Sequence, residues 1–330
     1  MRTHRSPFPW ALSILTVVTL GIPAPGHAQR AFRTGVEIVP LTVTVTDGSG
    51  TYVTNLAGSD FTVLEDGVPQ SLAFFASEQV PVDLALVLDV SSSMGRHLPL
   101  VRKAAGGLLR TLRTDDQVTV IGVNGSVAVL QPLTTDHTLI DTAIRGISAS
   151  GGTALYNGLY IVLKEFERER RDRSGLRRQA IVVLSDGLDT ASHIRFEEVM
   201  ELAQRVGVNI YVVSVPSSAA NRPRALQEGH ILQAEYAMRS LAREAGGRSF
   251  FPKAVKELPA IYGEIAQELA HQYELGYFPA QAAGDRGFRR VTVRVENAVA
   301  RTRSGYHAGT PERRTTSGDS IASSHSATRR

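Results

Sequence analysis

The segment VDLALVLDVSSS, which runs from Val82 to Ser93, joins a short apolar run to a polar one. The apolar part, Val82–Leu88, has the pattern of a strand that is buried on both faces, as strands of a parallel sheet are. Similar runs follow at Ile181–Leu184 and Ile210–Val215. Between the runs, apolar residues recur at helical spacing. This alternation predicts a parallel sheet with helices on both faces.

Outward from these strands, the same pattern predicts further elements of one domain. Two short strands are expected around Asn124-Gly125, at Val118–Val123 and Val127–Leu130. Apolar residues three or four positions apart predict helices within Leu98–Leu112, Leu155–Phe166, Phe196–Val206, Ala237–Ala245 and Val255–Leu269. The fold class is therefore an α/β domain over residues 82–271, with a doubly wound, mainly parallel sheet.

The sequence on both sides of this domain alternates with a two-residue period, which is typical of strands. An N-terminal β unit is expected over residues 34–78 and C-terminal strands over residues 272–308. The predicted strands are Val36–Val39, Leu41–Val45, Tyr273–Phe278, Phe288–Val295 and Arg301–Tyr306. Each flank is too small to be stable alone. We therefore predict that they pack together as one small β-sandwich-like unit.

Residues 1–28 have the pattern of a secretory signal peptide. They begin with basic residues, continue with a largely apolar stretch from Trp10 to Ile22, and end in Gly26-His27-Ala28. The apolar stretch is shorter than the roughly 20 residues that span a membrane. We expect cleavage after Ala28 and export to the periplasm, the cell surface or the extracellular space. No transmembrane segment is expected in the mature chain.

Composition excludes several classes of function. The chain has no cysteine, which excludes disulfides, zinc–thiolate sites and thiol catalysis. Its formal charge of +4 falls to +2 when Arg2 and Arg5 leave with the signal. This balance is no electrostatic footprint for a polyanion, so no nucleic-acid partner is expected. Residues 309–330 are rich in Ser, Thr and Arg, which predicts a disordered tail.

Three short polar motifs stand at predicted strand ends or helix starts, where open parallel sheets bind ligands. They are Asp89-Val90-Ser91-Ser92-Ser93, Gly151-Gly152-Thr153 and Ser185-Asp186-Gly187. Each motif alone is more typical of a helix cap or a turn. Together they offer two carboxylates and three hydroxyls, an all-oxygen set that suits Mg²⁺, Mn²⁺ or Ca²⁺. The predicted metal ligands are Asp89, Ser91, Ser93, Thr153 and Asp186.

These five residues, in this order, resemble the metal-ion-dependent adhesion site of von Willebrand factor type A domains. Four flanking segments resemble the VWFA-related proteins of Acidobacteria: Val43–Asp47, Asp60–Gly67, Tyr273–Tyr277 and Arg301–Tyr306. The resemblance implies a six-stranded sheet with both aspartates on adjacent central strands, where the strand order reverses. It also implies that Ser91, Ser93 and Thr153 contact the metal, and that the aspartates do so directly or through water.

The resemblance has one departure, and one acidic residue near the site is left out of the ligand set. Many such domains carry an aromatic–polar pair at the end of the strand that here reads Val120–Asn124, and the aromatic residue is missing. No role is therefore assigned to Asn124. Asp189 is interpreted as a turn residue or helix cap, with an indirect role at the metal as the alternative.

Three functions are compatible with the predicted site. The favoured one is a binding module that captures an Asp or Glu of a protein partner through Mg²⁺, with Mn²⁺ or Ca²⁺ as alternatives. The second is a metal-dependent hydrolase, because an ion with open positions can activate water. No His-Glu-x-x-His, Gly-x-Ser-x-Gly or phosphate-loop motif is present, so we predict that the protein is not an enzyme. The third is a scaffold in which the ion is only structural.

Overall fold

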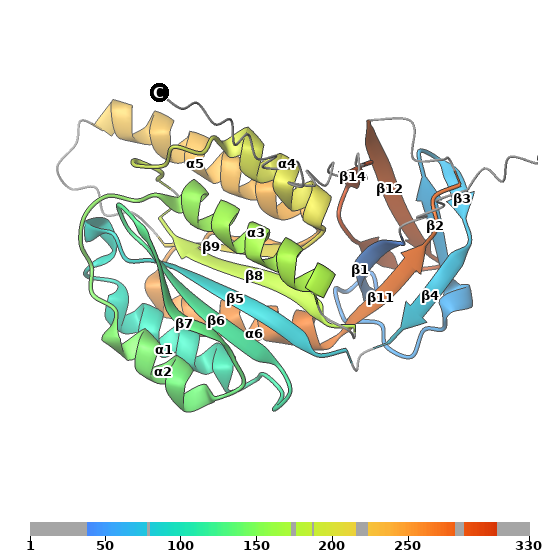
Figure 1. Cartoon of the computed structure of the whole chain (residues 1–330), viewed down its shortest axis with the longest axis horizontal. Coiled ribbons are helices and arrows are strands. Elements are labelled where there is room, and N and C mark those ends of the chain that lie inside the picture. Colours follow the sequence, from blue (N-terminus) through green and yellow to red (C-terminus); the bar gives the residue numbers. More distant parts are fainter. Residues whose placement is uncertain are drawn as a thin grey trace, which may run out of the picture. The chain divides into compact units, whose positions relative to one another are not determined.

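The computed structural model describes residues 38–77, 80–172, 176–186, 188–215, 224–280 and 287–308 (Figure 1). The predicted signal peptide, the predicted tail and Gly187 lie outside the described residues. The predictions for those segments remain predictions.

A six-stranded sheet forms the centre of the α/β domain, with the strand order β10-β9-β8-β5-β6-β7. Neighbouring strands are parallel except β7, which is antiparallel to β6. The central strands β5 and β8 are buried along their whole length. The strand bounds are β5 (Val82–Asp89), β6 (Gln117–Val123), β7 (Val127–Thr134), β8 (Arg178–Ser185), β9 (Asn209–Ser214) and β10 (Ser249–Phe250). The predicted fold class is confirmed, including the reversal of strand order beside β5.

Helices cover both faces of this sheet (Figure 1). One face packs against α1 (Leu98–Leu109), α2 (His137–Gly146) and α6 (Leu258–Ala270). The other packs against α3 (Leu155–Asp172), α4 (Phe196–Val206) and α5 (Arg224–Glu244). Short 3-10 turns lie at η1 (Gly58–Asp60), η2 (Ser92–Met94) and η3 (Val255–Glu257).

Helix α2 was not predicted from the sequence. It buries only two large apolar residues, Ile140 and Ile144, one turn apart. Its clearest local signal is the N-cap Asp136, whose carboxylate accepts hydrogen bonds from the amides of Thr138 and Leu139. Two apolar positions are too few to establish a helical period. The helix is therefore recognised only in the structure, where it packs against β7.

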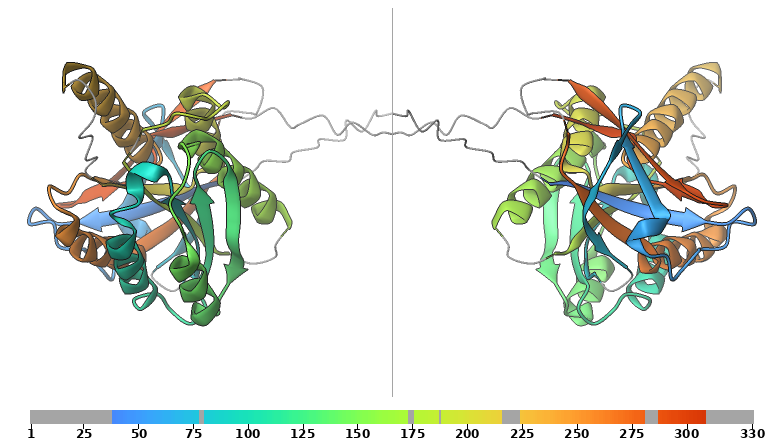
Figure 2. Two further views of the ribbon diagram at one scale, coloured as in Figure 1. Left: turned by 90° about the vertical axis from the view of Figure 1, so that its left-hand side faces the viewer. Right: turned by 90° about the vertical axis from the view of Figure 1, so that its right-hand side faces the viewer.

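The flanking strands form two four-stranded antiparallel sheets, ordered β13-β1-β11-β4 and β14-β12-β2-β3. Each sheet combines strands from both ends of the chain, and one apolar cluster joins the two sheets. The right-hand view of Figure 2 shows the blue N-terminal strands beside the orange and red C-terminal ones. The bounds are β1 (Val39–Thr46), β2 (Phe61–Glu65), β3 (Val68–Gln70), β4 (Leu72–Ala76), β11 (Gln272–Tyr277), β12 (Phe288–Val295), β13 (Val299–Arg301) and β14 (Gly305–His307).

Two strand predictions in the sandwich were wrong in detail. Val36 and Glu37 of the first predicted strand lie outside the described residues. From Val39 onward a single strand, β1, continues through Pro40, so no break separates Val39 from Leu41–Val45. The segment Arg301–Tyr306 forms two short strands in different sheets. The chain leaves the first sheet at Arg303, whose buried guanidinium donates to the carbonyls of Gln204 (3.1 Å) and Pro40 (3.0 Å).

A buried carboxylate joins the two sheets of the sandwich. Glu65 of β2 accepts hydrogen bonds from the hydroxyls of Tyr277 (2.6 Å) and Tyr306 (2.9 Å). Arg289 of β12 lies 3.4 Å from the same carboxylate. Three of the flanking segments noted in the sequence therefore meet at one residue. No described helix is both long and apolar enough to cross a membrane.

Candidate metal site

The first three predicted ligands lie together in the loop that follows β5. Asp89 is the last residue of the strand and is fully buried. Its Oδ1 accepts a hydrogen bond from the amide of Ser91 (2.9 Å), and the hydroxyls of Ser91 and Ser93 are 3.0 Å apart. The turn η2 brings Ser93 back toward Ser91, and Ser93 remains exposed. The structure therefore places a buried carboxylate beneath two hydroxyls, one of which is open to solvent.

The fourth predicted ligand, Asp186, lies beside this group at the end of β8. The two strands pair in parallel up to Leu88 and Leu184, so the residues that follow leave the sheet side by side. Asp186 is buried, and its Oδ1 accepts a hydrogen bond from the amide of Leu188 (3.2 Å). Its Oδ2 is also buried, and no described residue hydrogen-bonds to it. A buried carboxylate oxygen without a donor is costly unless a cation or water meets it.

Thr153, the fifth predicted ligand, is buried in a loop that touches both strand ends. The amide of Ser92 donates to the carbonyl of Gly151 (3.0 Å), and the amide of Ser150 donates to the carbonyl of Val90 (2.8 Å). Gly151 has a φ of +72°, a conformation that costs glycine little. The loop therefore turns sharply against the residues that follow Asp89.

The loop after β8 fixes Thr153 from the other side. The amide of Thr153 donates a hydrogen bond to the hydroxyl of Thr190 (3.0 Å). The carbonyl of Thr153 accepts hydrogen bonds from the amides of Thr190 and Ala191. The carboxylate of Asp189 accepts a hydrogen bond from the amide of Tyr156 (2.9 Å), in the first turn of α3. It also accepts hydrogen bonds from the amide and the hydroxyl of Ser192. Asp189 thus acts as the turn and cap residue that the sequence favoured.

Sequence reasoning missed two supporting residues. Ser185 donates a 2.6 Å hydrogen bond to Oδ2 of Asp89. Its position directly before Asp186, on a strand beside β5, was the available signal. Asn124 was given no role. Its side-chain oxygen accepts a hydrogen bond from the amide of Ser126, and its backbone carbonyl accepts one from the amide of Ala154 (2.6 Å). It therefore supports the loop that carries Thr153.

The electrostatics of the site follow from two buried carboxylates close to each other. Burial raises the pKa of Asp89, and the charge of Asp186 raises it further, against the lowering effect of the hydrogen bonds from Ser185 and Ser91. Within the described ranges, neither aspartate forms an ion pair with a basic side chain. His97, at the start of α1, has its pKa lowered mainly by burial and raised by Asp186. The arrangement therefore attracts a cation.

The donor set fits a hard divalent cation. The described part of the chain contains no group of three or more His, Cys, Asp or Glu side chains that could hold a metal. A metal site here therefore depends on hydroxyl oxygens as well as the two carboxylates. Oxygen-only sets of this kind suit Mg²⁺, Mn²⁺ and Ca²⁺ rather than softer metals.

Comparison with known proteins places the α/β domain in a family. Residues 83–264 match the family model of the von Willebrand factor type A domain. An uncharacterised protein of Borreliella burgdorferi is 27% identical over 146 residues, which cover 41% of this chain and 41% of that protein. An uncharacterised protein of Synechocystis is 34% identical over 112 residues, which cover 33% of this chain and 26% of that protein.

The chain thus matches less than half of the length of these two curated relatives. Among solved structures, a von Willebrand factor type A protein from Catenulispora acidiphila aligns with a TM-score of 0.47 and 11% identity. That alignment covers 82% of this chain and 71% of the other.

Proposed function

Because the chain belongs to the von Willebrand factor type A domain family, we propose that it is an exported module that binds a protein partner through a divalent cation. The ligands are Asp89, Ser91, Ser93, Thr153 and Asp186, acting as a metal-ion-dependent adhesion site. Domains of this family usually act as non-catalytic binding modules. The flanking motifs support a place among the VWFA-related proteins of Acidobacteria, and residues 1–28 support export.

The observation that carries this proposal is the unneutralised pair of buried carboxylates. Asp89 and Asp186 face no basic partner among the described residues, and Asp186 keeps one oxygen without a donor. The hydroxyls of Ser91 and Ser93 lie 3.0 Å apart above them. Such a group is expensive to bury without a cation.

The residues divide the work of holding the ion and leaving it accessible. Asp89 and Asp186 supply two negative charges, while Ser91, Ser93 and Thr153 supply neutral oxygens. A bound divalent cation would supply a coordination position that a carboxylate can take. Exposed Ser93 marks the side from which a ligand can approach. An Asp or Glu of a protein partner, rather than a nucleic acid, is the ligand we propose.

The proposal is tested by capturing partners from the envelope of the source organism. Wild type and Thr153→Ala are immobilised, each with Mg²⁺ and with chelator. Thr142→Ala is the matched control, because Thr142 is an exposed threonine on α2. We expect capture by wild type and Thr142→Ala with Mg²⁺, and a loss of at least about tenfold with chelator or in Thr153→Ala, equivalent to roughly 1.4 kcal/mol.

Three outcomes would contradict the proposal. Equal capture in all samples would show that recognition uses another surface. Mg²⁺-dependent hydrolysis of ester, peptide or phosphate substrates by wild type, absent in Thr153→Ala, would favour a hydrolase. Binding that survives in Thr153→Ala while Mg²⁺ still stabilises the wild-type fold would favour a scaffold with a structural ion.

A further inference from the structure

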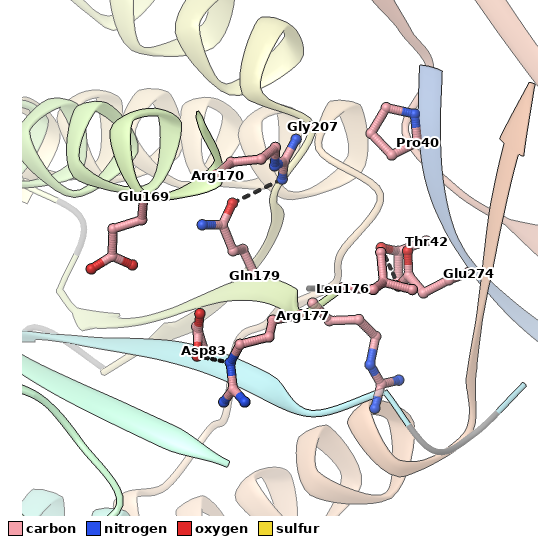
Figure 3. Close-up of a pocket in the computed structure, with 11 residues that line it drawn as sticks. Pro40, Thr42, Asp83, Glu169, Arg170, Leu176, Arg177, Gln179, Gly207 and Glu274 are labelled. Carbon is pink, nitrogen blue, oxygen red and sulfur yellow. Dashed lines mark hydrogen bonds and ion pairs between the residues drawn. The ribbon is translucent and has the colours of Figure 1, made fainter. Parts of the chain in front are cut away.

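A small cavity lies at the amino ends of β5 and β8, at the opposite edge of the sheet from Asp89 and Asp186 (Figure 3). Its volume is about 120 Å³. The sandwich and the α/β domain each form one wall. The residues that matter here are Pro40, Thr42 and Glu274 from the sandwich, and Asp83, Arg170 and Arg178 from the α/β domain.

Glu274 is a buried acid in this cavity, only 6% exposed, on the central strand β11. Its Oε1 accepts a hydrogen bond from the hydroxyl of Thr42 (2.7 Å) on the neighbouring strand β1 (Figure 3). No ion pair joins it to a basic side chain within the described residues. The one direct contact of Glu274 across to β1 is therefore with a neutral group.

The basic residues of the cavity are bound to other acceptors. Arg177, directly before β8, forms a 2.6 Å ion pair with Asp83 of β5, and Arg170 of α3 donates to Gln179 (2.8 Å) (Figure 3). Arg178 of β8 donates to the carbonyls of Val80 (3.0 Å) and, more weakly, Gln272 (3.5 Å).

The remaining elements around Glu274 add little compensating charge. Helix α3 also contributes Glu169, a second acid, to the lining. Strand β4 places Ala76 opposite Glu274. Buried Arg303 bonds to the carbonyl of Pro40 rather than to Glu274. A carboxylate at position 274 would therefore have one direct donor, Thr42, and no ion pair within the described residues, which does not offset the cost of burying its charge. A neutral carboxyl does not bear that cost.

We propose that the proton on Glu274 controls how tightly the sandwich is held against the α/β domain at this cavity. The neutral carboxyl keeps the seam closed, and the carboxylate draws water into the cavity and loosens β1 and β11 against β8. The inference goes beyond the metal-dependent binding proposed above and does not depend on it.

The expected titration falls near neutral pH. Burial raises the pKa of Glu274 to about 7, against smaller lowering effects of Thr42, Arg178 and Arg170. The ordinary value is 4.5. Because the folded value is the higher one, the stability that the neutral form contributes is complete below 4.5 and is lost as pH rises through about 7.

Glu274→Gln in the full chain tests this inference, because it imposes a neutral side chain of the same shape. Glu296→Gln is the matched control, since Glu296 is an exposed glutamate in the turn after β12. Chelator is present throughout, so that the metal site does not contribute. Amide hydrogen exchange, corrected for the intrinsic effect of pH, is measured at about pH 6 and about pH 8, together with thermal melting.

We expect wild type and Glu296→Gln to lose protection in β1 and β11 at the higher pH, on the order of tenfold. Glu274→Gln is expected to keep its protection and to melt about 5 °C above wild type at high pH. Wild type and Glu274→Gln should melt alike only below pH 4.5.

An unchanged pH dependence in Glu274→Gln, or a lower melting temperature than wild type at high pH, would overturn the proposal. A carboxyl titration of Glu274 in wild type, followed by NMR, gives a second reading that does not depend on the variant. A measured pKa at or below the ordinary value of 4.5 would also overturn it.

Discussion

The two edges of the six-stranded sheet both bury carboxylates, but they treat the charge differently. At the carboxyl edge, Asp89 and Asp186 meet hydroxyls and backbone amides. At the amino edge, Asp83 meets the guanidinium of Arg177 at 2.6 Å. The same sheet therefore holds neutralised carboxylate at one edge and carboxylates without a basic partner, within the described residues, at the other.

This difference separates structural charge from charge that is available to a ligand. In a buried ion pair, each charge is compensated by the other, so that removing one partner leaves an uncompensated charge. Two buried carboxylates among hydroxyls are satisfied only when a cation from outside joins them. Mutations at the two edges should therefore have opposite consequences for the metal-free fold.

The largest effect is expected at the amino edge. Arg177→Met removes the guanidinium that forms a 2.6 Å ion pair with Asp83, whose side chain is only 2% exposed. The free energy of unfolding should fall by about 3 kcal/mol, measured by urea denaturation. Arg195→Met is the control, because its ion pair with Glu198 is exposed and should matter little. Equal losses in the two variants would remove the distinction between the edges.

At the carboxyl edge, the second prediction concerns the metal. Mg²⁺ at about 100 times its Kd should stabilise wild type by about 2.7 kcal/mol, on the order of 5–10 °C in thermal melting. Asp186→Asn should abolish this shift yet leave the metal-free protein no less stable, because it removes one of two like charges. Asp141→Asn, at an exposed ion pair on α2, should keep the shift.

A metal-free Asp186→Asn that unfolds more easily than wild type would show that Asp186 has a hidden cationic partner. Unchanged melting of wild type across Mg²⁺, Mn²⁺ and Ca²⁺ would contradict the site itself.

A smaller effect should follow from the hydroxyl that supports Asp89. Ser185→Ala removes a 2.6 Å hydrogen bond to a buried carboxylate, which is worth about 1.5–2 kcal/mol. Denaturation with chelator measures it. Ser126→Ala, which loses only a bond to the amide oxygen of Asn124, should cost less. If both variants cost the same, Asp89 does not depend on Ser185 for its charge.

The smallest effect concerns pH. The pKa of Asp89 is raised above 3.8, chiefly by burial. Its protonated form thus stabilises the metal-free fold fully below 3.8, and that contribution is lost as pH rises through the raised value. Because the ion needs the carboxylate, the Mg²⁺-induced melting shift should shrink as pH falls from neutral toward the ordinary value of 3.8. A shift that is independent of pH would exclude Asp89 as a ligand.

Local patterns were enough to predict most of the α/β domain. The apolar run before Asp89 and the run before Asp186 indicated fully buried strands, and both proved central. Helix α2 was not predicted, because Ile140 and Ile144 alone do not establish a helical period. The site prediction came from residue types at strand ends, and the structure brings Asp89, Ser91 and Ser93 into direct contact.

The sequence by itself determined the strand–helix alternation, the polar ends of β5 and β8, and the alternating flanks, because each is a short-range pattern of side-chain polarity. Tertiary structure alone decided that Ser185 donates a hydrogen bond to Asp89 and that Glu65 accepts hydrogen bonds from Tyr277 and Tyr306. It also decided that Glu274 lies in a cavity between the sandwich and the α/β domain. Those partners are 96 to 241 residues apart in the chain. No local period carries such pairings, because they depend on strand register between distant segments.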